Sequence, residues 1–240
     1  MRQAGFIIGS KTKLVILGAQ GQVGRAVAAQ AGRRRIAGGA LGRAECDITD
    51  RAAVARAVAG SGLVVNCAAY TSVDQAEAEV ETAYRINAVG AETVATVCAE
   101  AGIPLLHLST DYVFDGASPL PAREDDPARP VNAHGRSKLA GEIAVRERLQ
   151  SHIVLRTSWV FSADGQNFVK TMLRLAHARA PLQVVDDQIG GPVSPIGAPI
   201  ISAGRRRSAA TSLPMPCLQA VTPRCSRLRP WIIRHRRGVH

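Results

Sequence analysis

A glycine-rich turn between an apolar run and a helical segment constrains this chain more than any other feature. The apolar run is KLVIL, the turn is GAQGQVG with Gly18, Gly21 and Gly24, and the following VGRAVAAQAG predicts a helix that ends at Gly32. Glycines at this spacing allow a tight reversal, let the backbone approach a pyrophosphate, and direct helix N-terminal amides at its negative charge. Such glycines can also serve a tight turn alone, but the strand and helix on either side favour a dinucleotide site.

Strands and helices continue to alternate along the chain. A second unit starts near Ile36, and its helix is followed by further apolar runs and helical segments. The predicted helices are 50–60, 80–102 and 135–149, and the predicted strands are 63–69, 104–110 and 152–158. This alternation predicts an α/β fold, a Rossmann-like doubly wound parallel sheet with helices on both faces. Ligands of such sheets collect outside the carboxyl ends of the strands.

The net charge of +11 would ordinarily suggest a nucleic-acid or membrane partner, but its distribution indicates otherwise. No Asp or Glu follows Asp187, whereas nine arginines do. We therefore expect a Rossmann domain with the catalytic segment at residues 1–192 and a basic, Pro/Arg-rich tail at 193–240. A frameshift, a misread gene end or a natural extension would each give this tail. Trp231 alone is thin support for a nucleic-acid platform, so a disordered tail is favoured over a nucleic-acid-binding module.

The cysteines and the apolar segments bear on the compartment. Five cysteines are scattered and none forms C-x-x-C, which argues against a disulfide framework and against a zinc site. Lys11 and Lys13 interrupt the apolar opening of the chain before a secretory signal develops, and no stretch is long enough to span a bilayer. We expect a cytoplasmic protein without a membrane segment.

Polar residues at a strand end and on a helix could form an acid/base site. Thr110 ends the predicted strand 104–110, and Lys138 lies four residues after His134 on the predicted helix 135–149. Positions four apart share a helix face, so both side chains could meet a hydroxyl at the strand end.

These segments together resemble the dTDP-4-dehydrorhamnose reductase family of extended short-chain dehydrogenases/reductases. The matching segments run in family order over residues 13–192, and they are GAQGQVG, CDITD, NCAAYTSVDQAEAE, INAVGAE, STDYVFDG, HGRSKLAGE, RTSWVF, NFVKTML and VVDDQIGGP. The resemblance implies reduction of dTDP-4-dehydro-6-deoxy-L-mannose to dTDP-L-rhamnose with NADPH, or NADH, in nucleotide-sugar biosynthesis. It also implies a homodimer, with Mg²⁺ at the dimer interface in some members.

The resemblance assigns roles residue by residue. Thr110 would hydrogen-bond the carbonyl oxygen of the substrate, Lys138 would hold the nicotinamide ribose, and position 134 would supply the proton. Eleven residues would contact the cofactor: Gly18, Gly21, Gln22, Val23, Gly24, Asp47, Ile48, Ala69, Tyr70, Thr71 and Lys138. Three would face the sugar nucleotide: Thr110, Asp111 and Trp159. Asp47 and Ile48 could instead belong to a helix cap, and Trp159 could be a core aromatic residue.

The choice between NADPH and NADH depends on the adenosine ribose. Dinucleotide sites place an acid about twenty residues after the turn for the ribose hydroxyls, or arginines for a 2′-phosphate. This chain has Arg33, Arg34, Arg35 and Arg43 in that region, which favours NADPH, although a solvated basic loop explains these arginines equally well.

The chain departs from the family at two places. The family has a tyrosine where this chain has His134, and repulsion from Lys138 would push the imidazole pKa below its ordinary value, leaving a neutral, poor proton source at pH 7. Loss of a general acid typically costs ~10²–10⁴-fold, so we expect activity lowered by about that factor. The family also continues past VVDDQIGGP with a C-terminal substrate lobe, where this chain has Arg-, Pro- and Ser-rich sequence.

The altered position 134 leaves a second hypothesis open. A non-catalytic NADP-binding regulatory subunit, similar to the β subunit of methionine adenosyltransferase, would also keep the glycine turn and Lys138 while losing the acid. Such a subunit has no need for groups on the carbonyl side, so the presence of Thr110 and Asp111 favours the enzyme.

Overall fold

The computed structural model describes residues 12–118, 120–178, 186–188, 191–195 and 233–234. Most of the predicted basic tail, residues 196–232 and 235–240, lies outside the described residues. Within the described ranges, no helix combines the length and the apolarity that crossing a membrane requires.

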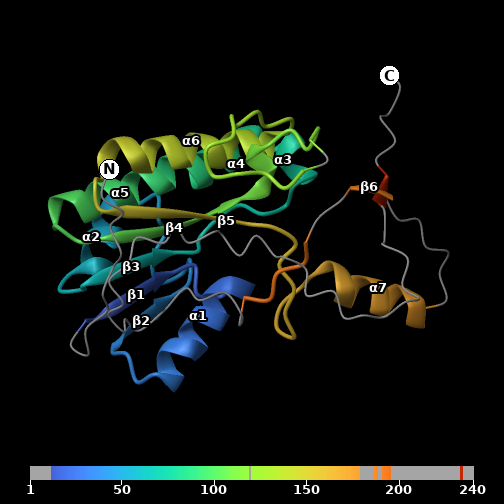
Figure 1. Ribbon diagram of the computed structural model, residues 1–240. Coiled ribbons are helices and arrows are strands. Elements are labelled where there is room, and N and C mark those ends of the chain that lie inside the picture. Colours follow the sequence, from blue (N-terminus) through green and yellow to red (C-terminus); the bar gives the residue numbers. More distant parts are fainter. Residues whose placement is uncertain (1–11, 119, 179–185, 189–190, 196–232, 235–240) are drawn as a thin grey trace, which may run out of the picture.

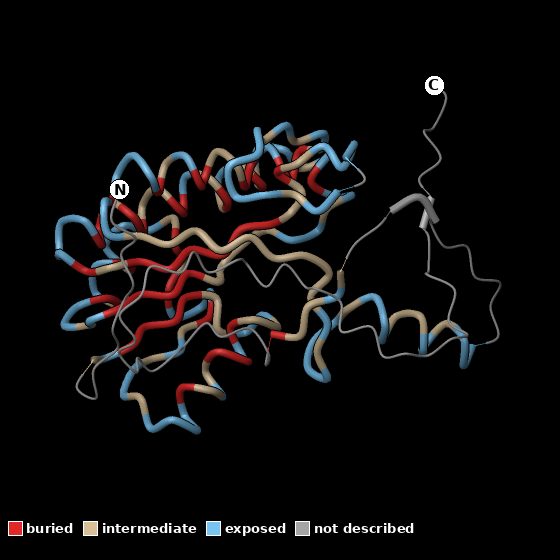
Figure 2. The backbone as a smooth tube through the Cα atoms, in the orientation of Figure 1, coloured by how far each residue is buried: buried red, intermediate tan, exposed pale blue. Residues whose placement is uncertain are grey.

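Five parallel strands form the central sheet, in the order β2-β1-β3-β4-β5 (Figure 1). Their bounds are β1 Leu14–Leu17, β2 Gly38–Leu41, β3 Leu63–Asn66, β4 Leu105–Thr110 and β5 His152–Thr157. The three inner strands β1, β3 and β4 are buried along their whole length, whereas the edge strands β2 and β5 are not (Figure 2). Strands buried on both faces explain the continuous apolar runs in the sequence. The predicted Rossmann-like parallel sheet is confirmed.

Helices cover the two faces of the sheet unequally. The helix α1 (Gln22–Arg33) packs Val27 against Leu14 and Ile16 on one face. The opposite face is covered by α2 (Arg51–Val58), α5 (Gly90–Glu100) and α6 (Ala133–Arg148), and its core includes Val15, Leu17, Val64, Val94 and Leu105. Figure 1 shows α5 and α6 along one side of the strands and α1 on the other. Alternate residues of β1 thus face two separate cores, as the period of a strand requires.

The predicted helix 80–102 is interrupted by a π-helical turn. The segment consists of α4 (Val80–Tyr84), the π-helix η1 (Arg85–Val89) and α5. A π-turn inserts one extra residue into a helix and is often found at functional sites. The apolar pattern alone did not predict this turn, which carries the buried Asn87.

The helix α6 begins slightly earlier than the sequence predicts. Asn132 caps it, because the side-chain Oδ1 accepts a hydrogen bond from the backbone amide of Gly135 at 2.7 Å. Position 134 therefore lies inside the helix, with His134, Ser137, Lys138 and Glu142 all buried. This buried face is polar rather than apolar, which is unusual for a helix packed on a sheet.

Several short elements complete the described structure. They are α3 (Gln75–Ala78), the 3₁₀ turn η2 (Asp111–Val113), α7 (Phe168–His177), β6 (Asp186–Gln188) and β7 (Ile233–Arg234). The strands β6 and β7 pair antiparallel with each other. The described residues 191–195 lie beside the segment that follows β5, since Val160 and Val193 form an isolated parallel bridge.

Candidate functional site

The glycine turn lies at the carboxyl end of β1 and closes tightly onto its neighbours. Gly18 has a φ of +75°, and a Cβ at this position would lie 2.4 Å from the backbone nitrogen of Ala68. A Cβ on Gly24 would lie 2.3 Å from the carbonyl oxygen of Gly18. The helix α1 starts after Gly21 without a side-chain cap, so its first amides are not satisfied by a capping side chain. An uncapped helix N-terminus behind a glycine cradle is suited to an anionic phosphate group.

The segment after β3 lies beside this turn. The backbone amide of Cys67 donates to the carbonyl oxygen of Leu17 at 2.9 Å, which joins the ends of β1 and β3. From β1 the chain continues to β2 on one side of the sheet, and β3 then lies on the other side of β1. Open α/β sheets bind ligands at such a switch point in strand order. The predicted cofactor-contacting residues Ala69, Tyr70 and Thr71 follow directly on this segment.

Asn87 fixes the segment after β3 and links it to α6. Its Oδ1 accepts a hydrogen bond from the backbone amide of Tyr70 at 2.8 Å, and its Nδ2 donates to the Tyr70 carbonyl at 3.1 Å. The same Nδ2 donates to Ser137 Oγ at 3.0 Å, and that hydroxyl donates to the carbonyl oxygen of His134 at 2.8 Å. One buried amide therefore connects the glycine-turn side of the site with the helix that carries positions 134 and 138.

Thr110 and Asp111 stand at the carboxyl end of β4. The hydroxyl of Thr110 donates to Asp111 Oδ1 at 3.1 Å and accepts from the backbone amide of Tyr112 at 3.2 Å. Burial raises the pKa of Asp111. The hydrogen bonds from Thr110 and from backbone amides act in the opposite direction, but their effect is smaller than that of burial. The structure thus places a hydroxyl and a carboxyl group together at the strand end, as the sequence predicts.

His134 is buried beside Tyr112, with the two rings edge to face and their centroids 5.8 Å apart. Its Nδ1 has no hydrogen-bond partner within the part of the chain that the structure describes. Burial, and secondarily the charge of Lys138, lower the imidazole pKa to about 4. The direction agrees with the sequence analysis, but burial is the larger cause, which charge spacing alone could not indicate.

Lys138 is fully buried one turn further along α6. Its Nζ donates to the carbonyl oxygen of Leu108 at 2.6 Å. Burial lowers its pKa to about 8, against the opposing effects of Glu142 and Cys67. A lysine with this pKa is still mostly an ammonium at pH 7.

The remaining predicted contacts lie around the same edge of the sheet. Asp47 Oδ1 accepts hydrogen bonds from the backbone amide and the hydroxyl of Thr49. Ile48 packs in the hydrophobic core. The N-cap of α2 is Asp50 and not Asp47. Gln22 Oε1 accepts from Asn167 Nδ2 at 3.1 Å, so the segment after β5 reaches the start of α1.

Trp159 follows β5 with a φ of +45°, in the left-handed region that non-glycine residues rarely adopt. It is only partly buried, and its ring centroid lies 6.4 Å from that of Phe168. Trp159 is therefore not a core residue, and its strained backbone is consistent with the predicted contact to the sugar nucleotide.

Three of the four arginines that favoured NADPH lie at the wrong end of the sheet. Arg33 ends α1, which is twelve residues and therefore about 18 Å long, and Arg34 and Arg35 follow it. All three are exposed and precede β2, whereas a ligand of the glycine turn lies at the carboxyl edge. The solvated-loop interpretation is correct for them. Arg43 does follow β2, where its Nε lies 3.6 Å from Asp47 Oδ2.

Two buried residues of the site region were missed by the sequence analysis. Asn87 lies in INAVGAE and Glu142 in HGRSKLAGE, both segments that carry the family resemblance. A polar residue within an apolar helical pattern can indicate a buried polar side chain. Neither the spacing nor the composition of the sequence indicates the hydrogen-bond partners of Asn87 and Glu142.

Together these features define an α/β protein of the Rossmann-like class, with a glycine turn, a hydroxyl and an ammonium at the carboxyl edge of its sheet. More particularly, the chain belongs to the family described as "RmlD substrate binding domain", whose model matches residues 12–199.

Similar proteins carry consistent names. The chain is 44% identical to a dTDP-4-dehydrorhamnose reductase of Sinorhizobium fredii over 204 residues, which cover 83% of this chain and 69% of that protein. It is 48% identical to the protein of the same name from Mycolicibacterium smegmatis over 182 residues, covering 75% of this chain and 56% of that protein. The chain thus spans only part of these relatives' length.

Solved structures agree with this assignment. A dTDP-4-dehydrorhamnose reductase of Bacillus anthracis, solved in complex with NADP, is 40% identical, with a TM-score of 0.74 over 77% of this chain and 66% of that chain. The UDP-glucose 4-epimerase of Brucella ovis is 18% identical, with a TM-score of 0.70 over 77% of this chain and 70% of that chain, and supports the fold alone.

Proposed function

We propose that this chain binds NADPH and reduces the C4 ketone of dTDP-4-dehydro-6-deoxy-L-mannose, giving dTDP-L-rhamnose. One observation carries this proposal. The glycine turn before the uncapped helix α1, the Thr110 hydroxyl and the Lys138 ammonium lie at the same edge of the sheet. The names of the relatives at 44% and 48% identity, and the NADP complex of the Bacillus anthracis protein, support it.

The residues present fit a reduced nicotinamide dinucleotide. Gly18 and Gly24 keep the turn tight, because a Cβ at either position would clash with backbone atoms, and the uncapped amides of α1 would hold the pyrophosphate. Lys138 would hold the nicotinamide ribose. The cofactor, when bound, supplies a hydride to the ketone carbon. Arg43 is the remaining candidate for a 2′-phosphate contact, so we propose NADPH as the preferred cofactor, with NADH possible as a substitute.

The protein side of the reaction is charge stabilisation and proton delivery at the carbonyl oxygen. Thr110 would donate a hydrogen bond to this oxygen, and a positive charge on Lys138 would stabilise negative charge near it. His134 can donate an N–H, but a neutral imidazole gives up its proton reluctantly, and with a pKa of about 4 its conjugate acid is a very small fraction at pH 7. We therefore propose a reductase with slowed proton transfer.

The alternative of a non-catalytic NADP-binding regulatory subunit rests on His134 alone. It is not favoured, because Thr110 and Asp111 keep a half-buried hydroxyl–carboxyl pair on the carbonyl side, for which a binding subunit has no use. Cofactor binding without any turnover, even after the acid at position 134 is restored, would support it instead.

Several further assignments remain proposals. We keep the boundary between the Rossmann domain (1–192) and the tail (193–240), the cytoplasmic location and the homodimer as predictions. The Mg²⁺ ion at a dimer interface also remains a prediction, and no ligands can be named for it.

Two measurements on the purified full-length chain test the proposed function. NADPH binding, followed by nicotinamide fluorescence, is expected to saturate. NADPH oxidation with the dTDP-4-keto sugar is expected to be slow but above the rate without sugar. A folded chain with no affinity for NADPH or NADH would contradict the proposal.

A further inference from the structure

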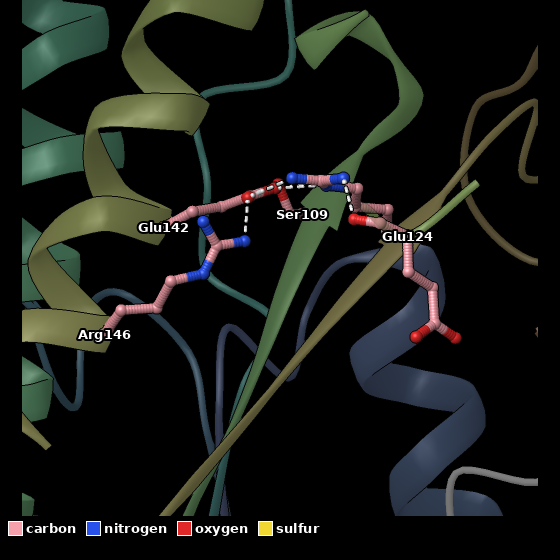
Figure 3. Close-up of polar contacts among 5 residues, drawn as sticks. Ser109, Glu124, Glu142 and Arg146 are labelled. Carbon is pink, nitrogen blue, oxygen red and sulfur yellow. Dashed lines mark hydrogen bonds and ion pairs between the residues drawn. The ribbon is translucent and has the colours of Figure 1, made fainter. Parts of the chain in front are cut away.

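A buried carboxylate occupies the middle of α6, one turn beyond Lys138. Glu142 is fully buried and accepts hydrogen bonds from Ser109 Oγ at 2.6 Å and from Arg156 Nε and Nη2 at 2.9 and 2.7 Å. Arg146 Nη2 adds a fourth contact at 2.8 Å (Figure 3). Burial raises the pKa of Glu142, but the bonds from Arg156 and Ser109 outweigh it and hold the pKa below its ordinary value. Glu142 is therefore an ionised, fully partnered buried group.

The contacts of Glu142 and Lys138 fix the end of β4 at two consecutive residues. Lys138 binds the carbonyl oxygen of Leu108, and Glu142 binds the hydroxyl of Ser109. The next residue is Thr110, whose hydroxyl belongs to the site. Because Lys138 and Glu142 are four residues apart, they lie on one face of α6 and act on the strand together.

Glu142 also reaches the neighbouring strand. Arg156 lies on β5, paired in register with Ser109 on β4, and its guanidinium stacks 4.9 Å from the ring centroid of Phe114. A single carboxylate thus joins α6, β4 and β5. Replacing a buried ion pair by well-packed apolar residues is often neutral or stabilising, so stability alone does not explain this charge.

The charges around Lys138 give Glu142 a second effect. The titratable groups that interact with Lys138 are Cys67 after β3, His107 on β4, and His134 and Glu142 on α6. Burial raises the pKa of Cys67 to about 12 and lowers the pKa of both histidines below their ordinary value, so these three are uncharged at pH 7. Within the described residues, Glu142 is then the anion of this group.

We propose that Glu142 is a positioning residue of the reductase site: it holds the Ser109–Thr110 end of β4 against α6 and keeps the Lys138 side chain cationic. The proposal rests on the proposed function for the roles of Thr110 and Lys138. Glu142 itself acts through these neighbours and not on the substrate or the cofactor.

Lysine NMR tests this proposal without cofactor. Lysine occurs only at positions 11, 13, 138 and 170, so a chain labelled with ¹³Cε-lysine gives few signals, and Lys138→Arg identifies the one of interest. In Glu142→Gln, the midpoint of the Lys138 titration is expected to fall by about 0.5 to 1 pH unit, because the neighbouring anion is removed. The control is Glu147→Gln, which removes the same charge from an exposed position of α6 and is expected to leave the midpoint unchanged.

An orphaned Arg156 could unfold Glu142→Gln, so a second variant is needed. The double variant Glu142→Gln/Arg156→Met removes both charges. The midpoint of the Lys138 titration is still expected to fall, because the charge of Glu142 raises the pKa of Lys138, whereas Arg156 is not among the groups that affect this pKa. An unchanged Lys138 midpoint in whichever of the two variants folds would overturn the proposal.

Cofactor binding separates this proposal from the proposed function. Glu142→Gln is expected to bind NADPH about two- to five-fold more weakly than the wild type at pH 8 and almost equally at pH 6.5, since only the fraction of protonated Lys138 differs. A wild-type chain that does not bind NADPH contradicts the proposed function. If the wild type binds NADPH and Glu142→Gln binds it as tightly as the wild type at both pH 8 and pH 6.5, the proposed role of Glu142 is contradicted.

Discussion

At the scale of single residues, the imidazole at position 134 decides how fast this site can work. Its pKa of about 4 leaves it neutral at the pH where the Lys138 ammonium is present. A tyrosine beside an ammonium is a better proton donor to an alkoxide, because the ammonium stabilises the phenolate that forms. The neighbouring Tyr112 ring already packs against this position, so an aromatic replacement has a surface to contact.

His134→Tyr is therefore expected to raise the rate of ketone reduction by about 10²–10⁴-fold. Steady-state NADPH oxidation with the dTDP-4-keto sugar measures this gain, and His134→Phe, which restores the ring without the hydroxyl, is the control. Equal rates for the Tyr and Phe variants would show that position 134 does not deliver the proton.

The same histidine should make folding stability depend on pH. Its folded pKa is depressed from about 6.5 to about 4, so the unfolded chain binds the proton first as the pH falls. Stability from this group is complete above about pH 6.5 and is lost as the pH falls towards 4, by about 1.4 kcal/mol per unit. His107 acts in the same direction, because burial lowers its pKa as well.

We expect the loss of unfolding free energy between pH 7 and pH 5 to be smaller by up to about 2 kcal/mol in His134→Tyr than in the wild type. Urea denaturation at the two pH values measures the difference. The same loss in both proteins would mean that the imidazole is accessible to protons in the folded state.

At the scale of elements, the glycine turn and α1 offer a matched pair of positions. Gly24 and Gly32 both lie in α1, but a Cβ at Gly24 would lie 2.3 Å from the Gly18 carbonyl, whereas a Cβ at Gly32 would meet nothing within 4 Å. Gly24→Ala must displace the turn that would hold the pyrophosphate, so NADPH affinity is expected to fall at least about ten-fold, equivalent to roughly 1.4 kcal/mol.

Gly32→Ala is the control for this change. It should leave the affinity unchanged and stabilise the helix by up to about 1 kcal/mol, since alanine has the higher helix propensity. Fluorescence titration with NADPH and thermal unfolding measure the two effects. Equal NADPH affinities for Gly24→Ala and Gly32→Ala would contradict the binding of the pyrophosphate at the glycine turn.

The elements also show where sequence reasoning stops. The runs that became β1, β3 and β4 could be predicted because strands buried on both faces are mainly apolar. The π-turn at Arg85–Val89 could not, because its residues fit an ordinary helical pattern. The position of Thr110 and Lys138 at one sheet edge followed from parallel topology, but the partners of Asn87 and Glu142 depend on how α6 packs, which no local pattern encodes.

At the scale of the whole molecule, the two cores and the ligand edge are separate parts of one sheet. Leu105 begins β4 and is fully buried in the core shared with α5, and the site residue Thr110 ends the same strand. Thr110 lies five residue steps after Leu105, which is about 16 Å along the strand. Packing in this core should therefore determine stability with little effect on the site.

Leu105→Ala is accordingly expected to lower the free energy of unfolding by about 2–5 kcal/mol, through lost burial and the cavity left behind. Leu120→Ala is the matched control, because Leu120 is 73% exposed, and its change should stay within about 0.5 kcal/mol. Urea denaturation measures both, and NADPH titration below the unfolding transition should give the wild-type affinity for both variants. A large loss of affinity in Leu105→Ala, in protein that is still folded, would contradict this separation and show that strain in the core reaches the carboxyl edge of β4.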